Sequence, residues 1–122
     1  MYRKRTKKQQ LRSKADKLFK DTCFEKYGYN CEICNETYLA TAHHYYYRSS
    51  CSHLRFDIDN GVILCGRCHA KLHFKDPEIV EEQIIKARGI KWFNRLKKKA
   101  KNPPKYYKFD EKFIEKSINE LE

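Results

Sequence analysis

Four side chains that can bind a metal ion occur within nine residues, in the segment CGRCHAKLH from Cys65 to His73. A second CxxC pair, Cys31 and Cys34, precedes this segment, and 30 residues of chain separate the two pairs. Two CxxC turns offer four thiolates, which is the ligand set of an all-cysteine tetrahedral zinc site. The sequence therefore predicts that Cys31, Cys34, Cys65 and Cys68 hold a structural Zn²⁺.

Two histidines, His69 and His73, are left over if the four cysteines close one site. On a helix, residues four apart share a face, whereas the neighbours Cys68 and His69 point about 100° apart. A zinc finger of two cysteines and two histidines would leave Cys65 and Cys68 unused, and its central spacing would be far too long. Two separate sites are therefore the favoured interpretation.

Two histidines on a helix need a third ligand, and the pair His43-His44 can supply it. Neighbouring residues of a strand point to opposite faces, so one histidine can bind a metal while the other has a different task. The alternative for either one is a hydrogen-bonded structural histidine. Four of the five histidines lie close to the cysteine pairs in the sequence, which favours the metal site.

In order along the chain, Cys31xxCys34, His43-His44, Asn60 and Cys65xxCys68-His69xxxHis73 resemble the HNH endonucleases over roughly residues 31–73. That family has a ββα-metal motif of two strands and a helix around one divalent ion. The resemblance implies that His44 is the general base, oriented by Asn60, and that His43, His69 and His73 bind the catalytic ion. A loop pattern from Arg48 to Asn60 also resembles phage recombination nucleases of the lambda NinG type.

Hydrolysis of a phosphodiester needs an activated water and stabilisation of negative charge, and a neutral imidazole with a pKa near ~6.5 is a suitable base. The sequence thus predicts a metal-dependent endonuclease that nicks DNA or cleaves it according to its structure. The catalytic ion would be Mg²⁺, Mn²⁺, Ni²⁺ or Zn²⁺. The alternatives are a catalytically inactive zinc module that binds DNA or RNA and a ribosome-associated zinc protein, but the intact His/Asn set favours the enzyme.

The elements that must position these residues form a small α+β fold, with a ββα-metal core stapled by the four-cysteine zinc site. We expect strands at 38–47 and 61–65, followed by a helix at 66–74. Before them, apolar residues spaced three and four apart predict a helix from about 9 to 27 that ends at Gly28 and buries Cys23. Cys51 and His53 are interpreted as loop residues.

Helices are also predicted after the core. Asp76 is expected to cap a helix that has Pro77 at its first position and runs to about Arg88. A basic helix continues past Gly89 to about residue 100, and Asp110 is expected to cap a last short helix. The chain is thus divided into an N-terminal basic helix (1–28), the HNH core (29–76) and a C-terminal basic extension (77–122), within one domain overall.

Charge is concentrated at the two ends of the chain. Residues 1–20 contain nine Lys/Arg against one Asp, and residues 86–108 contain ten Lys/Arg and no acid, in a chain of net charge +11. Such runs favour a polyphosphate partner, here duplex or branched DNA. The predicted nucleic-acid contacts are Arg48, Arg67, Lys71, Lys91, Arg95, Lys97, Lys98 and Lys99.

Aromatic residues interleave with the second basic run. Trp92, Tyr106 and Tyr107 could stack on unpaired bases. The alternative places Trp92 and Phe93 in the core, and for Phe93 that alternative is favoured. A homodimer or a phage protein partner is compatible with the sequence.

No apolar stretch is long enough to span a membrane, and the N-terminal segment has no apolar centre typical of a signal peptide. We therefore expect a cytoplasmic protein, in the host cytoplasm if phage-encoded. In a reducing compartment the six cysteines would be metal ligands or free thiols in preference to disulfides.

Overall fold

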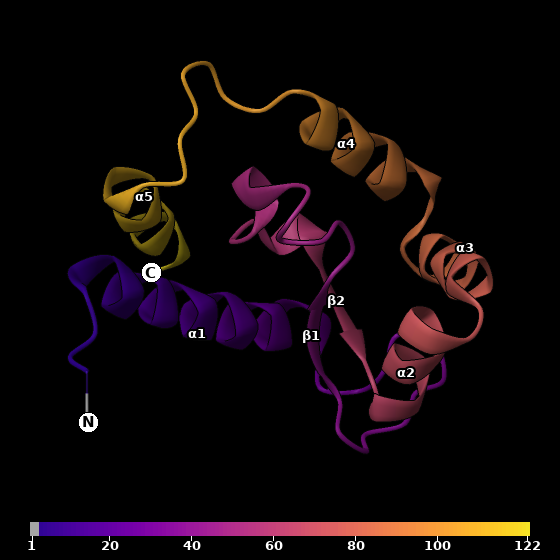
Figure 1. Cartoon of the computed structure of the whole chain (residues 1–122). Coiled ribbons are helices and arrows are strands. Elements are labelled where there is room, and N and C mark those ends of the chain that lie inside the picture. Colours follow the sequence, from indigo (N-terminus) through magenta and orange to yellow (C-terminus); the bar gives the residue numbers. More distant parts are fainter. Residues whose placement is uncertain (1–2) are drawn as a thin grey trace.

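The computed structural model describes residues 3–122 and has a small α+β fold with two antiparallel strands and five α-helices among these residues (Figure 1). The elements, in chain order, are α1 (Lys7–Tyr27), β1 (Thr41–His44), the 3-10 turns η1 (Ser52–Leu54) and η2 (Ile58–Asn60), β2 (Gly61–Leu64), α2 (Gly66–Phe74), α3 (Pro77–Arg88), α4 (Ile90–Lys101) and α5 (Glu111–Leu121).

The ββα unit is formed by β1, β2 and α2. The strands pair antiparallel, with His43 opposite Val62 and His44 opposite Gly61, and α2 follows β2 after a single residue. The first strand is shorter than the predicted span of 38–47, because only residues 41–44 pair with β2. Leu39, at φ 52°, has left-handed backbone geometry that an extended strand does not allow.

Strand β2 is buried on both faces, which explains its uninterrupted apolar sequence. Val62 and Leu64 pack into a core with α2, α3 and α4, whereas Ile63 packs into a second core with α1 and α5. This alternation follows from the two-residue period of a strand. The short sheet therefore lies between two hydrophobic layers and is fixed from both sides.

Helix α1 begins two residues earlier than predicted and ends where predicted, at Gly28 with φ 88°. Residues 1 and 2 of the predicted N-terminal unit lie outside the described residues. The predicted core position Cys23 is fully buried. Figure 1 shows α5 lying along the N-terminal half of α1, and the two helices share a core that includes Ile114 and Ile118. Asp110 caps α5 by accepting a hydrogen bond from Phe113 N–H, as predicted.

Helices α3 and α4 follow the predicted boundaries, with Gly89 between them at φ 99°. The prediction that the Asp76 side chain caps α3 is wrong, because that side chain makes no capping hydrogen bond. Asp76 instead donates its backbone N–H to Lys71 O at the end of α2, in the tight turn that joins the two helices. Among residues 3–122, no helix is both long and apolar enough to cross a membrane.

Candidate metal centre and active site

The side chains of Cys31, Cys34, Cys65 and Cys68 converge, and their sulfur atoms all lie within 4.8 Å of one another. Cys34 Sγ lies 3.6 Å from Cys65 Sγ and 3.7 Å from Cys68 Sγ. A tetrahedron with metal–sulfur bonds of about 2.3 Å has edges of about 3.8 Å, so these distances fit a zinc ion. The four cysteines can therefore hold a structural metal such as zinc.

Backbone N–H groups near the four cysteines favour metal binding by the cluster. Cys65 is the N-cap of α2, and its sulfur accepts a hydrogen bond from the backbone N–H of Cys68. Burial raises the pKa of Cys31, but backbone N–H groups of Cys34, Cys65 and Ile33 outweigh it and bring the pKa down to about 7. These donors stabilise the thiolate, which is the form that binds a metal.

Strand β1 separates the two neighbouring histidines, as its alternation predicts. His43 faces α2, where its ring stacks on His69 with ring centroids 3.7 Å apart. His69 in turn meets His73 edge-on at 4.4 Å, since residues four apart share a face of the helix. His44 points the other way and stacks on Phe19 of α1.

Three imidazoles from β1 and α2 thus gather, but they do not form a closed ligand set. Among residues 3–122, the four cysteines are the one group of three or more His, Cys, Asp or Glu side chains whose ligand atoms lie close enough together to hold a metal ion. Burial, followed by the nearby His69 and His73, lowers the pKa of His43 to about 4. Burial, followed by His73, also lowers the pKa of His69. Neutral imidazoles are the form that binds a divalent ion, so the donor chemistry fits one.

His44 is half-buried, and both an edge and a face of its imidazole ring make contacts within the protein. Its Nε2 atom lies 2.8 Å from the carbonyl oxygen of Arg55, and its ring stacks on Phe19 at 4.8 Å with 3° between the planes. A carbonyl can only accept, so Nε2 carries the proton and Nδ1 is left as a free acceptor. Burial lowers the pKa of His44, which favours the neutral ring.

Asn60 is fully buried and clamps the loop between the two strands. Its Oδ1 accepts from Tyr46 N–H at 2.8 Å, and its Nδ2 donates to the carbonyls of Tyr46 at 3.0 Å and Leu54 at 3.3 Å. Asn60 therefore makes no direct hydrogen bond to His44. Asn60 instead holds the carbonyl of Leu54. The next residue, Arg55, has the carbonyl that accepts the hydrogen bond from His44.

Comparison with known proteins agrees with this geometry. Residues 31–75 match the family model described as HNH endonuclease. The ββα unit is an HNH segment. The match spans both cysteine pairs, the two strands and α2, and it supports nuclease activity in general. Searches of curated proteins and of solved structures gave no match, and the resemblance of the loop to NinG-type nucleases stays a prediction.

An open pocket of about 650 Å³ joins the HNH segment to α1. His43, His44, His69 and His73 line it together with Arg48, the one predicted nucleic-acid contact in its wall. Among the lining residues that were not predicted as site residues, three come from α1: Asp16, Phe19 and Lys20. No motif marks them, since their only signal is a position on or beside the buried face of an amphipathic helix.

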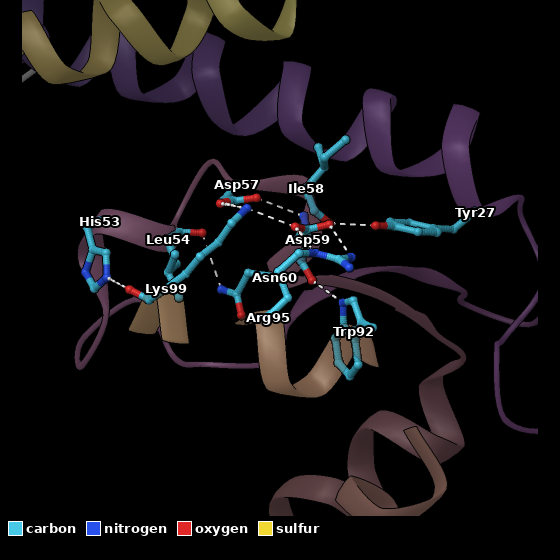
Figure 2. A network of polar contacts seen from close by, with 10 residues as sticks. All are labelled: Tyr27, His53, Leu54, Asp57, Ile58, Asp59, Asn60, Trp92, Arg95 and Lys99. Carbon is cyan, nitrogen blue, oxygen red and sulfur yellow. Dashed lines mark hydrogen bonds and ion pairs between the residues drawn. The ribbon is translucent and has the colours of Figure 1, made fainter. Parts of the chain in front are cut away.

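Two predicted nucleic-acid contacts, Arg95 and Lys99, have partners within the protein. Arg95 Nε lies 3.2 Å from Asp59, and Lys99 Nζ lies 3.0 Å from Asp57 and 2.9 Å from Asp59 (Figure 2). These pairs hold α4 against the η2 turn next to Asn60. The role of the two residues in DNA binding stays a prediction, as it does for Arg67, Lys71, Lys91, Lys97 and Lys98.

The aromatic residues near the second basic run divide between core and surface. Trp92 is buried and donates its ring N–H to Asp59 O at 2.8 Å, so it belongs to the core and does not stack on bases (Figure 2). Phe93 packs against the same core, as expected. Tyr107 bonds to Ser52, whereas Tyr106 is 88% exposed. His53, interpreted from the sequence as a loop residue, lies in the 3-10 turn η1, and its Nε2 is 2.9 Å from Lys99 O.

Proposed function

We propose that this protein is a metal-dependent DNA endonuclease in which His44 is the general base. The observation that carries the proposal is the division of the two adjacent histidines. His43 joins His69 and His73 on the α2 side, while His44 presents a neutral ring with a free Nδ1 to the same pocket.

His43, His69 and His73 would hold the catalytic ion, which is Mg²⁺, Mn²⁺, Ni²⁺ or Zn²⁺. A divalent ion bound there supplies positive charge for the scissile phosphate and for the leaving 3′ oxygen. Cys31, Cys34, Cys65 and Cys68 would hold a separate structural Zn²⁺, which closes the knuckles around the N-terminus of α2.

In the proposed reaction, His44 Nδ1 takes a proton from a water molecule as the water oxygen attacks phosphorus. The bond from phosphorus to the 3′ oxygen breaks, and that oxygen takes a proton from solvent water. The products are a 5′-phosphate and a 3′-hydroxyl. Lys20 and Arg48, both exposed at the pocket rim, would contact the neighbouring phosphates.

The test is nicking of supercoiled plasmid by the purified protein with Mg²⁺, Mn²⁺, Ni²⁺ or EDTA. We expect metal-dependent nicking with 5′-phosphate ends that His44→Ala abolishes. The matched control is His53→Ala, because His53 is also half-buried with Nε2 2.9 Å from a backbone carbonyl, that of Lys99, but lies outside this pocket. It should cleave like the wild type.

Two results would reject the proposal. Normal cleavage by His44→Ala would show that the base is a different group. Binding of plain and branched DNA without cleavage under any ion would instead indicate a zinc module that binds nucleic acid and has no catalytic role.

A further inference from the structure

Arg55, whose carbonyl accepts the hydrogen bond from His44 Nε2–H, contacts α1 through its side chain. Its Nε and Nη2 atoms bond to the two carboxylate oxygens of Asp16 at 3.0 and 2.8 Å. The Arg55 side chain is 13% exposed, and that of Asp16 is 37% exposed. A two-point contact of this kind fixes the orientation of both groups as well as their distance.

The backbone of Arg55 connects this ion pair to His44. Arg55 follows the η1 turn, and Asn60 holds the carbonyl of the preceding Leu54. The position of the Arg55 carbonyl is thus set from one side by Asn60 and from the other by Asp16. Because that carbonyl can only accept, its position favours the tautomer of His44 with the proton on Nε2.

The same helix also contacts the face of the His44 ring. Phe19 lies three residues after Asp16, on the same side of α1, and stacks on His44. The strand residue opposite His44 is Gly61, and a methyl group there would lie 3.0 Å from Phe19 Cζ and would clash with Cys23 Sγ. The glycine therefore lets α1 approach the strand pair at the position of the base.

We infer that Asp16, acting through Arg55, is a positioning residue for His44, and that α1 belongs to the catalytic site although it precedes the HNH segment. This inference rests on the proposed function. Without the carboxylate, the Arg55 guanidinium loses its fixed partner, the carbonyl moves, and the His44 ring is no longer held in one tautomer. The protein then contains both tautomers of His44, and only the molecules with the proton on Nε2 have a free Nδ1 for the first step of the reaction.

The experiment compares Asp16→Asn with the wild type by two measurements. Long-range ¹H–¹⁵N spectra of the folded protein, with zinc on the four cysteines and no other divalent ion added, report which nitrogen of His44 is protonated. Cleavage under single-turnover and steady-state conditions gives kcat and KM. We expect Asp16→Asn to show mixed tautomers and a 10- to 100-fold lower kcat, about the size seen when groups that orient a catalytic ligand are lost. KM should change less than about twofold, since Asp16 binds no phosphate.

Two further variants separate positioning from general damage. Asp16→Glu keeps the carboxylate and should recover part of kcat, whereas Arg55→Lys keeps the charge but loses the two-point contact and should behave like Asp16→Asn. The matched control is Asp21→Asn, because Asp21 is also an α1 aspartate in an ion pair, with the exposed Lys17 at 3.0 Å. It should match the wild type in both measurements.

A single Nε2-protonated tautomer in both Asp16→Asn and Arg55→Lys would overturn the inference, as would mixed tautomers with an unchanged kcat. Failure of the proposed function has a different result, namely a wild-type protein that cuts no DNA with any ion. In that case the spectra alone decide the inference: mixed tautomers in the variants support it, and an unchanged tautomer rejects it.

Discussion

His44 and Asn60 contribute to the site in different ways, although the HNH resemblance assigns both to the catalytic set. His44 lines the pocket, whereas Asn60 is fully buried and its three hydrogen bonds all go to backbone groups of the loop. One residue is placed to act on a proton, and the other determines where the loop runs. Substitutions should therefore separate chemistry from stability.

We expect Asn60→Ala to lower stability and activity together. The change leaves the N–H and carbonyl of Tyr46 without their partners and removes one of the two donors to Leu54 O, which also accepts from Asp57 N–H, at a cost of about 2–4 kcal/mol. Chemical denaturation measures this loss, and Asn102→Ala is the control, since Asn102 bonds to Lys98 O on the surface. A stable Asn60→Ala protein that fails only in cleavage would instead give Asn60 a direct catalytic role.

Cys34 should be needed for folding because its sulfur contacts two others of the four-cysteine cluster. Closing a structural zinc site contributes on the order of 10 kcal/mol to folding. We expect Cys34→Ala to lose zinc, measured by elemental analysis, and to lose its cooperative melting transition. Cys51→Ala, at a thiol outside the cluster, should keep both. A native melting curve for Cys34→Ala would contradict the structural role.

At the scale of elements, α4 contacts the η2 turn through one neutral hydrogen bond and several ion pairs. Trp92 bonds to the backbone of Asp59, and Arg95 and Lys99 bond to its carboxylate (Figure 2). Burial alone would raise the pKa of Asp59, but hydrogen bonds and positive charge from Arg95 and Lys99 outweigh it and lower the pKa to about 2. The contact between the basic helix and the loop is thus sensitive to acid.

Because the folded-state pKa of Asp59 lies below its unfolded value of about 3.9, the carboxylate stabilises the fold above about pH 4. That contribution is lost as the pH falls from about 4 towards 2. We expect Asp59→Asn to cost about 2 kcal/mol at pH 7. The difference in unfolding free energy between Asp59→Asn and the wild type should be smaller at pH 3 than at pH 7. Other effects of acid act equally on both proteins and cancel in this difference. A difference independent of pH would exclude this ionic role.

The packing of α1 on the strand pair depends on the absence of a side chain at Gly61. A methyl group there clashes with Cys23 and lies 3.0 Å from Phe19, both buried. We expect Gly61→Ala to destabilise the protein by about 1–3 kcal/mol. Gly66→Ala is the control, since its new methyl group would meet only the exposed side chain of Leu39 at 3.2 Å. Equal melting temperatures for the two variants would contradict this packing argument.

At the scale of the whole molecule, the basic residues fall into two groups. Arg95 and Lys99 pair with acids, whereas Lys97 and Lys98 on the same helix are exposed. Under the proposed function, the exposed lysines contact phosphates and release counterions when DNA binds. Neighbouring basic residues of α4 therefore differ in role, and their position in the sequence does not indicate which of them contact DNA.

We expect Lys97→Ala and Lys98→Ala each to weaken DNA binding and to reduce the slope of log K against log salt by about 0.9. Fluorescence anisotropy with a His44→Ala background measures this without cleavage. Lys99→Ala should mainly lower stability, because it removes partners of Asp57 and Asp59. An unchanged salt slope in both exposed-lysine variants would place the DNA elsewhere on the surface.

The sequence by itself determined the convergence of the four cysteines, the opposite directions of His43 and His44, and the ends of most helices. These features depend on local spacing: CxxC turns, the two-residue period of a strand, the 3.6-residue period of a helix, and glycine at helix ends. Each is set within a few residues, so the pattern can be read along the chain. The cysteine cluster and the main helix boundaries were predicted and are confirmed.

Only the tertiary structure decided which distant residues pair around His44 and the loop. Asp16 and Arg55 are 39 positions apart, and Lys99 and Asp57 are 42 apart. The sequence around Asp16, an aspartate on a basic helix, does not indicate its partner. The same holds for Lys99, a lysine within a basic run. Their pairing depends on how α1 and α4 pack around the loop, which is decided by burial of the two cores over the whole chain.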